Sequence, residues 1–294
     1  MKIVTFREGQ IEKVGVMMND KIIDVQFVSD VLSDLVKNRE FPVVYSLTEF
    51  ISQWEDIKKM LKLAEKTFNG NFYKLFSVKK AKLAAPISRE SKIICLGKNY
   101  AAHAKETGAD VPTEPIIFGK FADCVVANGE NVKYPDFAKR IDPEAELAVV
   151  IGKVCKNVKK RKAMDCVFGY TIANDVTERE LEYADMKEGH PWFRSKNFDS
   201  SMPLGPFIVT KDEVKNPHNL NISLYVNGKL RQQGNTKDMI FKIDELISYI
   251  SSYLTLYPGD IISTGTVSGI GPVEKGDFVS CQISKIGKLE NRIV

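Results

Sequence analysis

The stretch Asp142-Pro-Glu-Ala-Glu-Leu-Ala-Val-Val-Ile-Gly152 sets two acidic residues at the start of an apolar run. The run from Leu147 to Ile151 is rich in β-branched residues, which predicts a buried strand. Residues two apart on a strand point to the same face of the sheet, so we expect Glu144 and Glu146 to lie side by side. The sequence therefore predicts two like charges at the start of one strand.

A second strand is predicted over Gly169-Tyr-Thr-Ile-Ala-Asn-Asp175, and it also ends in an acid. Carboxylates held close together repel one another and resist transfer out of water, and a bound cation relieves both effects. Hard divalent ions prefer oxygen ligands. Glu144, Glu146 and Asp175 are therefore candidate ligands of Mg²⁺ or Mn²⁺.

The composition, with 44% hydrophobic and 27% charged residues among 294, is typical of a soluble globular protein. The net charge of +4 is a small excess on a mixed surface, so a nucleic-acid partner is not expected. Five cysteines without a Cys-x-x-Cys pair favour free thiols in a reducing compartment. No apolar run approaches the length of a membrane span, and the N-terminus is charged too early for a signal peptide. These features predict a cytoplasmic protein without a membrane partner.

The chain is expected to divide into two parts of an α+β protein. Residues 1–87 predict a small N-terminal α+β domain, in which short strands before residue 26 are followed by helices. Ser46 and Glu49 form the pattern of a capping box, and Gly70 is expected to end the helix that follows. Residues 88–294 are richer in strand signals and contain the acidic strands, so we expect the chemistry there. Within this part, Leu224–Leu230 predicts a β-hairpin with an Asn-Gly turn.

Three further segments carry candidate chemistry. His103 and Glu106 are three apart in a predicted helix, so the carboxylate could orient the imidazole as a general base, and a surface ion pair is the alternative. Lys196 lies in a turn-rich segment and could face a substrate carboxylate or a developing oxyanion; an exposed lysine is the alternative. The glycine-rich stretch Thr264–Gly271 lacks the spacing of a phosphate loop, but its backbone amides and the Thr266 hydroxyl could approach an anion.

Taken in order, these segments resemble the fumarylacetoacetate hydrolase family over about residues 88–294. So many separate matches in one order make the resemblance specific. The matching stretches are Leu96-Gly-Lys-Asn-Tyr100 with His103 and Glu106, Pro115–Lys120, Glu144-Ala-Glu146, Asn174–Thr177, Ser195–Asp199, Pro203–Pro206, Asn227–Gln232, Pro258–Asp260 and Thr264–Thr266.

The resemblance implies a β-rich roll of mixed sheets, assembled as a homodimer, with residues 1–87 as an accessory domain. It implies that the three acids bind Mg²⁺ or Mn²⁺. It also implies that His103 and Glu106 activate a water on a segment that orders over bound substrate, and that Lys196 is the active-site lysine. Substrate-binding roles are assigned to four residues in or beside the matching stretches: Lys120, Arg194, Gln232 and Thr266. Glu182 stands where several acylpyruvate-cleaving members carry glutamine, which leaves the exact substrate open.

The leading functional hypothesis is hydrolysis of a carbon–carbon bond in a β-diketo acid of the acylpyruvate type, a small anionic 2-oxo acid. Cleavage would release a pyruvate enolate, stabilised by the metal and Lys196. Isomerisation of a 2-hydroxy-diene dioate or decarboxylation of oxaloacetate would use the same enolate without an attacking water. A metabolite-binding protein without catalysis is a third hypothesis, although all six proposed catalytic and metal-binding residues are present.

Overall fold

The computed structural model describes residues 1–37, 39–79 and 81–294. Within these residues the largest element is a mixed sheet of eleven strands. Nine strands form its path, and two more attach to its side. In path order the strands are β3 (Lys21–Asp24), β2 (Ile11–Met18), β1 (Lys2–Glu8), β12 (Met202–Thr210), β10 (Val167–Asn174), β9 (Ala145–Ile151), β15 (Ile261–Thr266), β5 (Ile93–Gly97) and β6 (Ile116–Lys120), with β4 (Lys82–Ala84) on β1 and β7 (Val125–Val126) on β12.

Two smaller sheets complete the described strands. A four-stranded sheet has the order β14 (Lys229–Asn235), β13 (Asn221–Val226), β16 (Phe278–Ile283) and β17 (Gly287–Arg292), and β11 (Thr177–Glu178) pairs with β8 (Ile141–Asp142). Asn227 and Gly228 join β13 to β14 with φ of 50° and 76°, as a two-residue hairpin turn requires. The hairpin predicted from the Asn-Gly pair is therefore confirmed.

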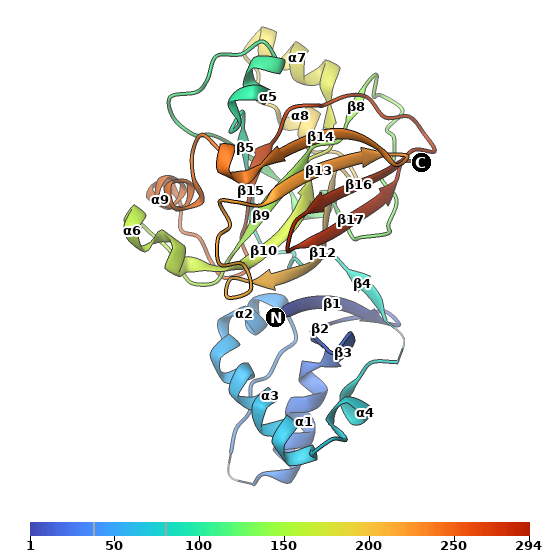
Figure 1. Cartoon of the computed structure of the whole chain (residues 1–294), viewed down its shortest axis with the longest axis vertical. Helices are drawn as coiled ribbons and strands as arrows, with labels where there is room; N and C mark the ends of the chain where they lie inside the picture. Colours follow the sequence, from blue (N-terminus) through green and yellow to red (C-terminus); the bar gives the residue numbers. More distant parts are fainter. Residues whose placement is uncertain (38, 80) are drawn as a thin grey trace.

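Helices cover the ends and sides of these sheets (Figure 1). They are α1 (Val25–Leu35), α2 (Leu47–Ser52), α3 (Trp54–Phe68), α4 (Phe72–Phe76), α5 (Ala101–Glu106), α6 (Lys160–Ala163), α7 (Arg179–Glu188), α8 (Phe193–Lys196) and α9 (Ile243–Tyr253), with 3-10 turns η1 (Ala122–Cys124), η2 (Met164–Cys166) and η3 (Thr236–Asp238). The predicted capping box of Ser46 and Glu49 is present at α2. The single helix expected after it is two helices, because the chain leaves helical geometry at Gln53. The α+β class is confirmed.

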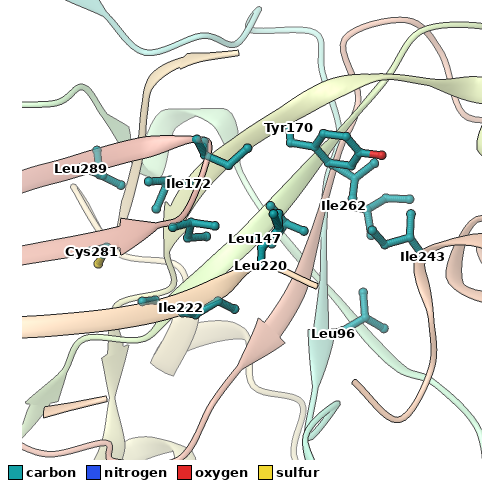
Figure 2. Packing of buried hydrophobic residues seen from close by; sticks show 14 of the residues in the cluster. Leu96, Leu147, Tyr170, Ile172, Leu220, Ile222, Ile243, Ile262, Cys281 and Leu289 are labelled. Carbon is teal, nitrogen blue, oxygen red and sulfur yellow. The ribbon is translucent and has the colours of Figure 1, made fainter. Parts of the chain in front are cut away.

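The main hydrophobic core fills the space between the large sheet and the four-stranded sheet. Figure 2 shows Leu147 of β9 and Ile172 of β10 packed close to Ile222 of β13 and Leu289 of β17. All four side chains are at most 1% exposed. A strand that is buried on both faces has an unbroken run of apolar residues in its sequence, which explains the β-branched stretch after Glu146.

The N-terminal part is tied to the rest of the chain by hydrogen bonds and by packing. β1 pairs antiparallel with β12, with Lys2 opposite Val209. Phe50 and Trp54 meet the ring of Phe168 at centroid distances of 6.4 Å and 5.7 Å. The large sheet therefore contains strands from both sides of the predicted boundary at residue 87. The division into 1–87 and 88–294 stays a prediction.

The five cysteines are free and buried. Among the helices of the described residues, none has the length and apolarity needed to cross a membrane. The cytoplasmic location inferred from the sequence stays a prediction.

Replacing Phe50 by alanine is expected to lower the free energy of unfolding of the whole chain by about 3–5 kcal/mol, since a fully buried aromatic side chain would leave a cavity. Urea unfolding followed by circular dichroism would measure the change. Tyr45→Ala is the control, because that side chain is 73% exposed and should alter stability by no more than about 0.5 kcal/mol. A Phe50→Ala chain with unchanged stability would show that this packing contributes little.

Candidate active site

The two predicted acidic strands lie side by side and bring three carboxylates together. β9 and β10 are antiparallel neighbours, with Ala145 opposite Asn174. This register puts Asp175 beside Glu144, and the Asp175 amide donates to the Glu144 carbonyl at 2.9 Å. One carboxylate oxygen from each of Glu144, Glu146 and Asp175 lies within 4.8 Å of the others. All three residues are at most 3% exposed.

Two buried lysines neutralise part of this charge. The Lys196 ammonium lies 3.0 Å from Glu144 and 2.8 Å from Asp175, and it donates to Thr177 Oγ1 at 2.7 Å. Burial disfavours its charge, but Asp175 and Glu144 outweigh burial and hold the pKa of Lys196 above its ordinary value. The Lys120 ammonium donates to the other Asp175 oxygen at 2.8 Å. Lys196 therefore stays protonated, and Lys120 fixes the Asp175 side chain.

Arg179 is a fully buried cation that the sequence analysis missed. Its guanidinium donates to Asp142 at 3.0 Å and also to Glu144 and Glu182. Burial opposes the charge of Glu144, but Lys196 and Arg179 together place the pKa of this carboxyl below its ordinary value. The only available signal was an arginine four residues after a proposed ligand, which spacing alone does not distinguish from a surface residue.

Among the described residues, Glu146 differs from Glu144 and Asp175 in having no cationic partner. Its carboxylate accepts hydrogen bonds from Ser263 Oγ at 2.6 Å and from the Gly265 amide at 2.9 Å. In the part of the chain that the structure describes, no side-chain cation lies within 4.0 Å of it. Burial and the nearby Asp175 raise its pKa to about 8. A divalent cation among the three acids would supply the missing positive charge, so this donor set fits such an ion.

His103 and Glu106 form a pair on α5. His103 Nδ1 lies 3.3 Å from Glu106 Oε2, while Glu106 Oε1 accepts from the Gly269 amide at 2.9 Å. His103 is 6% exposed and faces the same cavity as the acids. Glu106 thus connects the imidazole to the loop after β15 and orients its ring.

Part of this cluster lines one small cavity, in which about 20 Å³ is open to the centre of a water molecule. Its lining combines acids and cations with an aromatic and apolar wall. The lining residues are Leu96, Gly97, Lys98, His103, Thr107, Phe118, Glu144, Glu146, Arg179, Glu182, Met186, Trp192, Lys196 and Thr266. A small anionic molecule would meet positive and negative groups together, which suits a substrate that also binds a metal.

The four proposed substrate-binding residues have different positions. Thr266 lines the cavity, and the buried Gln232 amide donates to its hydroxyl at 2.8 Å. Gln232 therefore holds Thr266 in place. Lys120 contacts Asp175 from outside the cavity lining. The structure does not bring Arg194 to the cavity, because its 60% exposed side chain binds Asp185 of α7 at 2.7 Å.

Removing the Ser263 hydroxyl is expected to weaken Mn²⁺ binding by about tenfold to a hundredfold, because that hydroxyl orients the Glu146 carboxylate. Calorimetric titration of Ser263→Ala with Mn²⁺ measures the loss. Ser252→Ala is the matched control, since this exposed serine lies on α9 outside the cavity. Equal Mn²⁺ affinities for all three proteins would contradict the assignment of Glu146 as a ligand.

Comparison with known proteins places the chain among enzymes. The family described as "Fumarylacetoacetate (FAA) hydrolase C-terminal" matches residues 92–294. The mitochondrial oxaloacetate tautomerase FAHD2B of Bos taurus is 47% identical over 217 residues, which are 71% of this chain and 68% of that protein. The mitochondrial oxaloacetate tautomerase fahd2 of Xenopus laevis is 42% identical over 84% of this chain and 78% of its own length.

Solved structures agree with this relationship. Maleylpyruvate hydrolase from Sphingobium sp. SYK-6, in complex with manganese(II) ion and pyruvate, superposes with a TM-score of 0.79 at 28% identity, covering 100% of this chain and 99% of that one. Fumarylpyruvate hydrolase from Pseudomonas aeruginosa, in complex with Mn²⁺ and pyruvate, gives 0.67 at 35% identity, covering 74% and 92%. The resemblance expected from the motifs is thus confirmed, and the chain belongs to the fumarylacetoacetate hydrolase family.

Proposed function

We propose that this chain catalyses keto–enol tautomerisation of a small 2-oxo dicarboxylate of the oxaloacetate type. The observation that carries the proposal is the buried trio of carboxylates with the Lys196 ammonium beside it, next to a cavity that Glu144, Glu146 and Lys196 line. Sequence identity supports tautomerisation over hydrolysis. The chain is 47% and 42% identical to two oxaloacetate tautomerases, and 28% and 35% identical to two hydrolases of known structure. Hydrolysis, the leading hypothesis from the sequence, becomes the second candidate.

A divalent ion held by Glu144, Glu146 and Asp175 would supply Lewis-acid stabilisation of negative charge on the 2-oxo oxygen. Mn²⁺ is our first choice because two solved relatives are described with it, and Mg²⁺ is the alternative. The proposal is supported by the lack of a cationic partner for Glu146 among the described residues and by the chemistry of an all-carboxylate donor set.

The side chains around the three acids would stabilise the negative charge of the enolate and transfer protons. Ketonisation transfers the proton of the enol hydroxyl at C2 to solvent water and adds a proton to C3, with an enolate between the two steps. The Lys196 ammonium, held protonated by its carboxylate partners, would stabilise the enolate oxygen. We assign to His103 the role of donating the proton to C3, because Glu106 orients its ring.

Hydrolysis of an acylpyruvate is favoured by one specific feature, the His103–Glu106 pair. In that reaction His103 would take a proton from water, and the resulting hydroxide would attack the distal carbonyl. Cleavage of the adjacent carbon–carbon bond would then release a carboxylic acid and a pyruvate enolate. Two hydrolases of known structure were solved in complex with pyruvate, which is consistent with such a product. Isomerisation of a 2-hydroxy-diene dioate would use the same enolate.

We also propose that the chain forms a homodimer through an exposed aromatic surface beside the site. Phe121 and Phe193 are in contact with each other, and each is 57% exposed. Asn197 joins them to a groove that contains Phe137, which is 56% exposed. Exposed apolar surface of this kind commonly marks an interface. Sedimentation equilibrium that reported only monomer would contradict this assembly.

The enzyme with Mn²⁺ is expected to accelerate the loss of enol-oxaloacetate, followed by its ultraviolet absorbance, with keto-oxaloacetate as the immediate product by NMR. Lys196→Met should lower kcat by about a hundredfold to a thousandfold, because the enolate would lose its ammonium partner. Lys187→Met, on the exposed side of α7, is the matched control.

Thermal unfolding of Lys196→Met must be measured in parallel, since the substitution leaves Glu144 and Asp175 without their shared cation. Release of pyruvate from acylpyruvates without any tautomerisation of oxaloacetate would overturn the first proposal in favour of the second.

A further inference from the structure

The cavity lining contains four basic side chains, and one of them differs from the rest. Arg179 and Lys196 bind carboxylates of the buried cluster, and His103 lies beside Glu106. Lys98 lines the same cavity, yet within residues 1–37, 39–79 and 81–294 no carboxylate lies within 4.0 Å of its ammonium. Its charge is therefore available to a ligand.

The backbone fixes the place from which Lys98 extends. Its φ is +56°, in the left-handed region that residues with a side chain rarely adopt. The next residue, Asn99, anchors this conformation, since its buried amide donates to the carbonyls of Phe241 and Thr264 at 3.1 Å and 2.8 Å. The unusual conformation is thus held by long-range contacts, as is common where a residue serves a site.

An aromatic wall orients the Lys98 side chain. The Trp192 ring packs on Gly97 so closely that an added Cβ would lie 2.5 Å from it. Trp192 also meets Phe118 edge to face at 5.5 Å. The Lys98 ammonium lies 5.7 Å from the Trp192 ring, and the Lys196 ammonium lies 5.2 Å from Phe118. Two ammonium groups therefore line one wall: buried Lys196 at the acids and half-buried Lys98 nearer to solvent.

We propose that Lys98 binds the substrate carboxylate farthest from the reacting 2-oxo group, and so selects dicarboxylates over monocarboxylates. The inference rests on the proposed function, which puts the first carboxylate and the 2-oxo group at the acidic trio. The second carboxylate would be repelled by the acids of the lining unless it met a cation of its own. As far as the described residues go, Lys98 is the lining cation without a carboxylate partner.

Binding of two stable mimics tests this role without turnover. (S)-Malate and (S)-2-hydroxybutyrate share an α-hydroxy carboxylate, and they differ by a distal carboxylate in place of a methyl group. Calorimetry with the full chain and Mn²⁺ should show that Lys98→Gln weakens malate binding by about tenfold to a hundredfold, as expected for loss of a charge-assisted hydrogen bond. Binding of 2-hydroxybutyrate should change by less than about twofold, and Lys98→Arg should retain most of the malate affinity.

Two controls separate this effect from general changes. Oxalate, which has no distal group, should bind the Lys98→Gln variant with unchanged affinity if the acidic trio is intact. Lys105→Gln, on the exposed side of α5, removes one positive charge outside the cavity and should leave malate binding unchanged. Equal losses for malate and 2-hydroxybutyrate in Lys98→Gln, or no loss for either, would overturn the inference.

The binding test distinguishes failure of this inference from failure of the proposed function. A chain that does not convert oxaloacetate but prefers malate through Lys98 keeps this inference and loses the proposed function. A chain that tautomerises oxaloacetate with a malate affinity unaffected by Lys98→Gln keeps the function and loses the inference.

Discussion

Mutual repulsion among three buried carboxylates is the constraint on which the site depends. Glu144, Glu146 and Asp175 are withdrawn from water and lie close enough for their oxygens to share one ion. Charges in such a place must be paired or hydrogen-bonded, because an uncompensated buried charge costs several kcal/mol. Lys196, Arg179 and Lys120 pair with two of the three acids, and the third receives a hydroxyl and an amide hydrogen bond.

The fold meets this constraint through strand register. β9 lies between β10 and β15, so its first residues face Asp175 on one side and the Ser263–Thr266 segment on the other. A slip of one residue in either pairing would turn the Glu144 and Glu146 side chains to the opposite face. The buried β-branched stretch of β9 prevents such a slip, because it would also misplace the whole hydrophobic core. Stability and chemistry therefore depend on the same pairing.

Local patterns in the sequence predicted part of this arrangement. Period-two spacing predicted that Glu144 and Glu146 share a face, and the Asn227-Gly228 pair predicted a hairpin that the structure contains. The pairing of β1 with β12 was not predictable, because alternation shows which face of a strand is buried and not which strand lies beside it. The structure places Arg194, expected at the substrate, on Asp185 instead, since one motif position does not determine the direction of a long side chain.

Arg179 shows the opposite limitation. Nothing local distinguishes it from the many exposed basic residues, and only tertiary packing reveals its burial among three acids. Lys98 was noticed in the sequence only as part of a matching stretch. That its charge is available to a ligand follows from its surroundings in the folded chain. No sequence pattern predicts that a lysine lacks a carboxylate partner. Charge balance in a site is a property of the assembled fold.

Anomalous diffraction from crystals of the full chain soaked with Mn²⁺ and oxalate tests the central claim most directly. The account predicts one strong manganese peak coordinated by oxygens of Glu144, Glu146 and Asp175, with oxalate on its cavity side. A manganese peak elsewhere, or none while the three carboxylates keep their positions, would contradict it.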